Sequence, residues 1–260
     1  MRTKPTPGLV LAIFVAYGIY LIITFALSGV DYDQIGDSTE NVLRAVVVPV
    51  GIGSALLALL TGRLRWWEAA IRERSPAGPR WLLVVPGLML LIAVLNLVDN
   101  GVGDNSFGFL VVLAIGVCFV GFSEELLTRG LMLVGFRGSL SETWVWFLTS
   151  LLFGVLHGIN IIAGQAVDDT LQQIGFAFAF GSVLYLTRRV AGTLIVCMVI
   201  HATWDFSVFA VESGSTVTTT DTAPGIGQLF MIPLILVSIF GLVRVLRRPQ
   251  SGHRQATVGE

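Results

Sequence analysis

The sequence contains few charged residues and few of the residues on which common catalytic and metal-binding motifs depend. Charged side chains make up 13% of the 260 residues, and there are only three histidines and two cysteines. A soluble globular chain carries about 25% charged residues, so this composition excludes an ordinary soluble domain. A formal net charge of −1 provides no basic surface for nucleic acid, and we expect no nucleic-acid partner.

Several familiar site signatures are also missing. There is no HExxH and no GxSxG motif, which excludes zincin-type and serine-elbow hydrolases. Cys118 and Cys197 both lie in apolar stretches, so they form neither a secreted disulfide framework nor a CxxC metal knuckle. Tyr32-Asp33 and the stretch 101–104 imitate the YD and GxGD signatures of intramembrane aspartyl proteases. Both fall between apolar segments, and we interpret them as coincidental.

Long apolar runs are what the sequence does contain. Hydrophobic residues make up 54% of the chain, and the mean hydropathy is +0.82. Because a helix needs about 20 apolar residues to cross a bilayer, we predict an all-α, polytopic transmembrane helical bundle of about eight helices. The expected spans are 8–28, 42–61, 81–98, 107–134, 144–163, 171–187, 191–210 and 226–246.

The connections between these spans alternate in charge. Acidic side chains lie in the first, third, fifth and seventh connections: Asp31, Asp33, Asp37 and Glu40; Asp99 and Asp104; Asp168 and Asp169; Glu212 and Asp221. Arginines lie in the others and after the last span: Arg63, Arg65, Arg72, Arg74 and Arg80; Arg137; Arg188 and Arg189; Arg244, Arg247 and Arg248. The positive-inside rule then places both termini in the cytoplasm. We expect a multi-pass protein of the plasma (inner) membrane.

This reading divides the chain into four parts. Residues 1–106 hold the first three helices and a cytoplasmic loop at 62–80, which is either a short interfacial helix or a solvated loop. Residues 107–210 hold helices four to seven and the candidate catalytic core. Residues 211–248 form an external loop and the last helix, and residues 249–260 a disordered tail.

Ionisable side chains inside three of the spans mark a candidate site. The stretch 122–130, FSEELLTRG, carries Glu124, Glu125 and Arg129, although a charge at bilayer depth costs at least ~3 kcal/mol. Two other core spans carry His157 and the pair His201 and Asp205. At about 1.5 Å per residue, all of these groups reach a similar depth near the midplane. We therefore expect them to share one cavity.

Helical spacing separates the roles of the two glutamates. Adjacent residues point about 100° apart on a helix, so Glu124 and Glu125 face different surroundings. Glu125 and Arg129 are four residues apart with the acid first, the better order for an ion pair. Glu124 is then left as the candidate general base. On another helix, Phe153 lies one turn before His157, where its ring would line the cavity.

A structural interpretation applies to each feature taken alone. A single histidine can bond a neighbouring carbonyl, and the pair of Glu125 and Arg129 can simply fix helix packing. Cys118 and Cys197 lie at helical spacings from the polar groups, but burial among apolar residues is the ordinary interpretation for both. The conjunction of two Glu, two His and one Asp at one depth favours a site.

The three charged stretches together resemble the CPBP family, the CAAX proteases and bacteriocin-processing enzymes also called Abi, which includes the Ras-converting CAAX endopeptidase. The motifs of that family are EExxxR, FxxxH and HxxxN or HxxxD, in this order. The sequence matches them within residues 107–210. The matching residues are Glu124-Glu125 with Arg129, Phe153 with His157, and His201 with Asp205.

The resemblance implies an eight-helix intramembrane metalloprotease that acts on a membrane-associated peptide or protein substrate within the lipid bilayer. By position, Glu124 and His157 would activate water, and His201 and Asp205 would stabilise the oxyanion or help hold a metal. An ionised Asp205 has no hydrogen to donate to an oxyanion. Glu125, Arg129 and Phe153 would support the site.

The resemblance leaves the cofactor open. One mechanism binds Zn²⁺ through His157, His201 and a carboxylate, Glu124 or Asp205. The other uses Glu124 as the base without a metal.

Two other functions remain open for the same polar cluster. One is a non-catalytic membrane immunity or scaffold protein of the same fold, in which the cluster binds a partner. The other is a transporter with an ion site at the midplane, although broken helices and inverted repeats are not evident in the sequence.

Overall fold

The computed structural model describes residues 3–73, 76–214 and 226–247. These residues are helical almost throughout, and the part of the chain described contains no β-strand, only a single bridge between Arg72 and Thr193. The predicted all-α polytopic bundle is confirmed. The expected tail at 249–260 and residues 215–225 of the seventh connection lie outside the described residues.

Seven stretches among the described residues are long and apolar enough to cross a membrane. In chain order they are Pro7–Ser28, Thr39–Leu64, Arg80–Asn100, Phe107–Arg137, Glu142–Ile161, Val167–Ala191 and Leu194–Gly214. The first, sixth and seventh are the single helices α1, α9 and α10. The other four are divided: the second into α2 (Thr39–Val42), η2 (Leu43–Val47) and α3 (Val48–Leu64); the third into η3 (Arg80–Leu83) and α5 (Val84–Asn100); the fourth into α6 (Phe107–Glu125), η4 (Leu126–Met132) and α7 (Leu133–Arg137); and the fifth into α8 (Glu142–Leu156) and η5 (His157–Ile161). Shorter elements are η1 (Tyr32–Asp37), α4 (Trp67–Ile71), α11 (Ile226–Leu229) and α12 (Met231–Leu246).

The eighth expected span, 226–246, differs from the prediction. It is divided into α11 and α12, and α12 has only 16 residues. Pro233 provides the reason, because a proline removes one backbone donor and its ring crowds the carbonyl four residues earlier. That carbonyl belongs to Leu229, the last residue of α11.

The segment expected as a cytoplasmic loop at 62–80 contains a short helix, α4 (Trp67–Ile71), and part of it is buried against the bundle. Trp66 is fully buried, and its indole N–H donates to the carbonyl of Thr3 at 2.7 Å. The short helix α4 follows, and the guanidinium of Arg188 donates to the carbonyls of Ala69 and Ala70 near its C-terminal end. Trp66 and Ala70 therefore anchor this segment in the bundle, while Arg63, Arg65 and Glu68 remain exposed.

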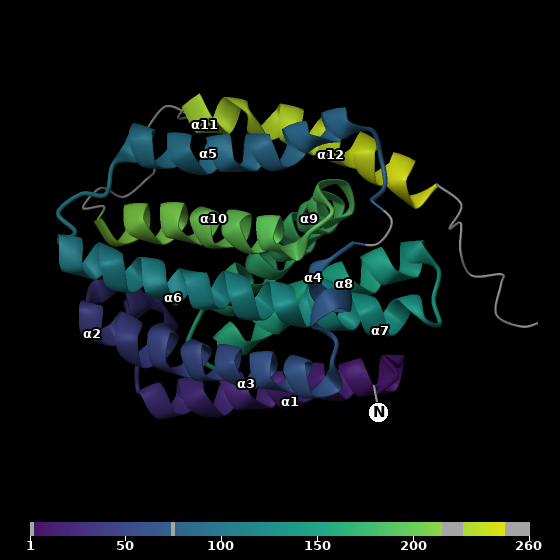
Figure 1. Ribbon diagram of the computed structural model, residues 1–260. Helices are drawn as coiled ribbons and strands as arrows, with labels where there is room; N and C mark the ends of the chain where they lie inside the picture. The colour runs from purple at the N-terminus through teal and green to yellow at the C-terminus, as the bar shows by residue number, and fades with distance from the viewer. Residues whose placement is uncertain (1–2, 74–75, 215–225, 248–260) are drawn as a thin grey trace, which may run out of the picture.

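The helices lie roughly parallel or antiparallel (Figure 1). In that view α1 and α3 form one side, α6 and α10 the middle, and α5 with α11 and α12 the other side. Glycines allow the closest pairs, because a Cβ on Gly121 of α6 would lie 2.8 Å from the carbonyl oxygen of Met198 on α10. A Cβ on Gly154 of α8 would lie 2.7 Å from that of Ile174 on α9. Small residues at such crossings permit close packing of membrane helices.

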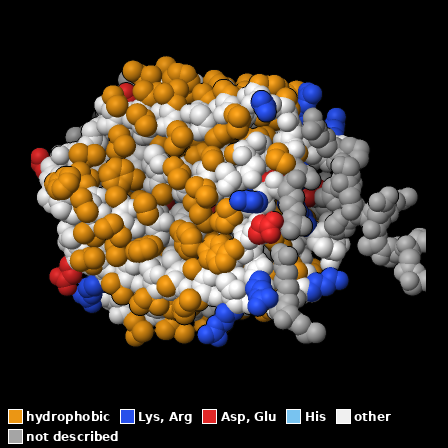
Figure 2. Space-filling model, in the orientation of Figure 1, with side chains coloured by type: hydrophobic (Ala, Val, Ile, Leu, Met, Phe, Trp, Pro, Cys, Tyr) orange, Lys and Arg blue, Asp and Glu red, His pale blue; other side chains and the backbone are white. Residues whose placement is uncertain are grey.

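The two ends of the bundle differ in charge. We call the end that carries η1 and the connections at 101–106 and 162–166 the acidic end, and the end that carries α4, α7 and the connection at 192–193 the basic end. Figure 2 shows hydrophobic side chains over the middle of one face, with most of the Lys and Arg in view toward the basic end on the right. The charge alternation in the sequence thus becomes a separation in space.

An ion-pair cluster lies inside the basic end. Nη1 of Arg137 lies 2.9 Å from Oε2 of Glu73, and its Nη2 lies 2.6 Å from Oε1 of Glu142. Glu142 also accepts hydrogen bonds from Tyr185 and Arg189 of α9. These contacts join α7, α8, α9 and the segment that follows α4.

Candidate active site

The first catalytic motif lies where α6 changes into a π-helix. Glu124 and Glu125 are the last residues of α6, and all seven residues of η4 are buried. The side-chain hydroxyl of Thr128 donates to the carbonyl oxygen of Glu124 at 2.6 Å. Short π-helical turns often occur at functional sites, and Arg129, which lies in this one, is buried and does not line the cavity described below.

The predicted ion pair between Glu125 and Arg129 is present. Nη1 of Arg129 lies 2.8 Å from Oε1 of Glu125, and both side chains are fully buried. The guanidinium carbon lies 4.1 Å from the centroid of the Phe153 ring, a cation–π contact. Gly181 of α9 leaves room for this arrangement, because a Cβ there would overlap with Nη2 of Arg129.

His201 connects this ion pair to the cavity. Its Nδ1 lies 3.1 Å from Oε1 of Glu125, and its Nε2 lies 3.4 Å from Oδ2 of Asp205 and 3.9 Å from Oε2 of Glu124. Three carboxyl groups therefore surround one imidazole. Phe153 and Phe180 hold the ring between them, each with its centroid 5.5 Å from that of His201.

His157 is the first residue of η5, directly after α8. Its Nδ1 lies 3.0 Å from the carbonyl oxygen of Phe153, and the two rings meet edge to face at 5.1 Å. A carbonyl oxygen only accepts hydrogen bonds, so Nδ1 carries the proton of the neutral ring. Nε2 is then the nitrogen that can accept a proton.

A cavity of about 440 Å³ brings the four predicted catalytic residues together. Glu124, His157, His201 and Asp205 all line it, as does Phe153. Oε2 of Glu124 is buried and has no hydrogen-bond partner among the described residues. The cavity thus presents the carboxyl groups of Glu124 and Asp205 and two imidazoles to whatever occupies it, with mostly apolar walls elsewhere.

Besides Thr24, three further polar residues that the sequence analysis missed line this cavity. They are Tyr32 of η1, Asn160 of η5 and Gln173 of α9. Nδ2 of Asn160 donates to Oε1 of Gln173 at 2.8 Å, and Nε2 of Gln173 donates to the hydroxyl of Tyr32 at 3.0 Å. We call these three residues the polar strip. The one feature of the sequence that indicates this strip is Asn160, an amide three residues after His157. Taken alone, it is too weak to predict a site.

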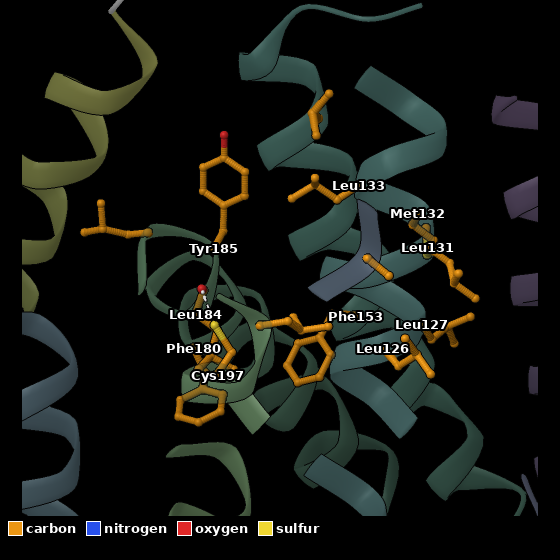
Figure 3. Packing of buried hydrophobic residues seen from close by; sticks show 14 of the residues in the cluster. Leu126, Leu127, Leu131, Met132, Leu133, Phe153, Phe180, Leu184, Tyr185 and Cys197 are labelled. Atoms are coloured by element: carbon orange, nitrogen blue, oxygen red, sulfur yellow. Dashed lines mark hydrogen bonds between the residues drawn. The ribbon is translucent and has the colours of Figure 1, made fainter. Parts of the chain in front are cut away.

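Neither cysteine lines the cavity. Cys118 is exposed on α6, so the prediction of a buried cysteine is wrong there because that side of the helix faces away from the bundle. Cys197 is buried as predicted, and its thiol donates to the carbonyl of Leu184 at 3.3 Å. Figure 3 shows it packed near Phe180 and Leu184, within the cluster of buried hydrophobic residues.

The His, Asp and Glu side chains of the site do not form an evident metal centre. Among the described residues, no group of three or more His, Cys, Asp or Glu side chains is placed so that it could hold a metal ion. The contacts of His201 are spaced for hydrogen bonds and ion pairs between side chains. We therefore derive no chemical step through a metal.

The comparison with known families locates the same part of the chain. Residues 106–207 match the family model described as type II CAAX prenyl endopeptidase, Rce1-like. Neither a curated protein nor a solved structure gives a match to the chain. The matched range contains all of the motif residues, from Glu124 at the end of α6 to Asp205 on α10. Residues 106–207 of the membrane-embedded bundle are therefore similar to an Rce1-like domain of the CAAX protease family.

Proposed function

We propose that the protein is an intramembrane endopeptidase that hydrolyses a peptide bond with a water molecule activated by Glu124 and His157. The observation that carries this proposal is the convergence of Glu124, His157, His201 and Asp205 on one cavity within the bundle. The similarity of residues 106–207 to an Rce1-like domain supports a protease of the CAAX type at the level of the family.

Glu124 is the group best suited to accept a proton from water. Its Oε2 is buried in the cavity wall without a hydrogen-bond partner among the described residues. The Nδ1 atom of His157 is engaged by Phe153, which leaves Nε2 as a second acceptor. A base within hydrogen-bond reach of water can remove a proton as the oxygen attacks the carbonyl carbon and later return it to the leaving amine.

His201 is the group best suited to stabilise the oxyanion. An oxyanion needs hydrogen-bond donors aimed at it, and the imidazole donates through Nε2, which faces the cavity. Because Nδ1 also donates to Glu125, this role requires the protonated ring, and the Asp205 carboxylate, 3.4 Å from Nε2, forms an ion pair with it. In this role Asp205 need not donate to the oxyanion, so its ionisation raises no difficulty.

Glu125 and Arg129 act as positioning residues in this proposal. Oε1 of Glu125 lies 2.8 Å from Nη1 of Arg129 and 3.1 Å from Nδ1 of His201. The same carboxyl oxygen therefore accepts hydrogen bonds from the guanidinium and the imidazole. This sharing fixes the direction in which Nε2 of His201 points.

The test is cleavage of a fluorogenic CAAX-type peptide by the detergent-purified protein, with the products identified by mass spectrometry. We expect one defined cleavage site for the wild type and loss of cleavage in Glu124→Gln and His157→Ala. A well-folded wild type that cleaves no peptide, but still binds a protein partner through the cluster, would support the immunity or scaffold alternative. Ion flux that depends on Glu124 would support the transporter.

A further inference from the structure

The cavity occupies only one half of the bundle. Its lining residues come from the parts of α1, α2, η2, α3, α6, α9 and α10 that lie toward the acidic end, together with η1, η5 and the end of α8. None comes from residues 126–152 or 181–200, which run from the level of the site to the basic end. Glu124 and His201 therefore lie at the inner end of a cavity that extends toward the acidic end.

The half of the bundle toward the basic end is filled with side chains. Residues with no exposed surface occupy η4, α9 and the start of α10 at this level: Leu126, Leu127, Arg129, Leu131, Leu184, Leu186 and Leu194. Beyond them lies the ion-pair cluster of Glu73, Arg137, Glu142 and Arg189. Close packing of this kind leaves no space for a peptide.

The outer part of the cavity is formed by a segment that lies outside the seven membrane-spanning stretches. Tyr32, Ile35 and Gly36 of η1 all line it. The backbone N–H of Tyr32 donates to the carbonyl of Ala163 at 2.7 Å, which holds η1 against the connection after η5. The cavity thus reaches from the catalytic residues to the loops of the acidic end.

The polar strip lies along this route. Burial raises the pKa of the Tyr32 phenol, the hydrogen bond from Gln173 opposes this shift, and the charges of Glu212, Asp205 and Glu124 add to it. The phenol therefore stays protonated and can donate a hydrogen bond. Together with the two amides, it offers donors and acceptors in an otherwise apolar wall, as an extended peptide main chain requires.

The difference in charge between the two ends indicates which side of the membrane the cavity extends toward. Short loops rich in Lys and Arg remain in the cytoplasm, and the arginines are concentrated at the basic end. The acidic end then lies on the outer side of the membrane.

We propose that the substrate is an extended polypeptide segment that reaches the site from the outer side of the membrane, and that the polar strip pairs with its main chain. The proposal rests on the proposed protease function for the nature of the ligand, and it narrows the substrate class to exported or outward-facing segments. A cytoplasmic chain end would not reach Glu124, because packed side chains and the ion-pair cluster fill the basic half.

Cysteine labelling tests the access route without requiring activity. In a Cys118→Ser, Cys197→Ser background, Gln173→Cys and Asn160→Cys each report on the cavity, Asp33→Cys on the acidic end and Arg80→Cys on the basic end. A membrane-impermeant charged maleimide is applied to spheroplasts and to inside-out vesicles. We expect the cavity cysteines and Asp33→Cys to react only from the outer face, and Arg80→Cys only from the inner face.

Other labelling patterns overturn the proposal. Reaction of both cavity cysteines from the inner face, together with Arg80→Cys, would place access at the basic end. Reaction of Asp33→Cys from the inner face would invert the orientation. Failure of both cavity cysteines to react, while both control positions do, would show a cavity closed to the outer solution.

A second arm separates this proposal from the proposed function. A charged, impermeant fluorogenic peptide is added to sealed right-side-out and inside-out vesicles, and then again after detergent. We expect cleavage with right-side-out vesicles and its loss with sealed inside-out vesicles, recovered on addition of detergent. No cleavage in detergent contradicts the protease function alone, whereas cleavage only by sealed inside-out vesicles contradicts the access route alone.

Discussion

Oε1 of Glu125 lies 2.8 Å from Nη1 of Arg129, and neither side chain has any exposed surface. A buried pair of this kind leaves a costly charge behind when one partner is removed. Because the same oxygen also contacts Nδ1 of His201 at 3.1 Å, the pair connects the stability of the bundle to the geometry of the site.

The first prediction concerns this pair. Arg129→Met should lower the free energy of unfolding by about 3–5 kcal/mol, since it leaves the Glu125 carboxylate buried without its partner. Replacing both residues, as Glu125→Gln with Arg129→Met, should cost less than Arg129→Met alone. Denaturant unfolding in detergent micelles measures both. A double variant that loses as much as the sum of the two single variants would show that the pair is not coupled.

The second prediction concerns the space around Arg129. Gly181→Ala would place a methyl group against the guanidinium of Arg129 and 3.1 Å from Cδ1 of Phe153, and overpacking of this kind costs about 1–3 kcal/mol. Gly175→Ala is the matched control on the same helix, because a Cβ there meets nothing within 4 Å. Thermal unfolding should show a loss for Gly181→Ala only. Equal effects would mean that Arg129 moves aside freely.

The third prediction concerns the polar strip. Gln173→Leu removes the hydrogen bonds that we assign to Tyr32 and to the substrate main chain. One such bond contributes about 0.5–1.5 kcal/mol, so we expect KM to rise about 2- to 10-fold with little change in kcat. Gln172→Leu, at an exposed neighbouring position, provides the control and should leave both constants unchanged. A fall in kcat at constant KM would assign Gln173 a role in the chemical step instead.

The fourth prediction concerns metal. Because the proposed mechanism activates water through Glu124 and His157 alone, we expect cleavage to persist after chelation and dialysis. Metal analysis of the purified protein accompanies the assay. Stoichiometric zinc that disappears in His157→Ala, with chelator-sensitive cleavage, would replace this account with a metalloprotease mechanism.

The relation between sequence and structure is closest where contacts are local. Glu125 and Arg129 are four residues apart in one helix, so their pairing followed from helical geometry alone. The shared cavity of Glu124, His157 and His201 was predicted from their depth in the bilayer. Each span has a fixed rise per residue and crosses the same bilayer, so the three side chains reach a similar level.

Contacts between segments that are distant in the sequence could not be predicted from local spacing or from depth. Tyr32 and Gln173 are separated by 141 positions, and no periodicity in either segment indicates that η1 lines the cavity. The exposure of Cys118 depends on how α6 is rotated against its neighbours. The break between α11 and α12 had a sequence signal, Pro233, that the hydropathy of the surrounding run obscured.

The central claim is that Glu124 activates the attacking water, and the most direct test is the cleavage rate of the purified protein on a fluorogenic CAAX-type peptide. Glu124→Gln keeps the size of the side chain and removes its basicity, and Glu40→Gln makes the same change at an exposed position on α2. A general base contributes about 10²–10⁴-fold to a rate. We expect a loss of that size in Glu124→Gln and the wild-type rate in Glu40→Gln; full proteolysis by Glu124→Gln would show that Glu124 is not the base.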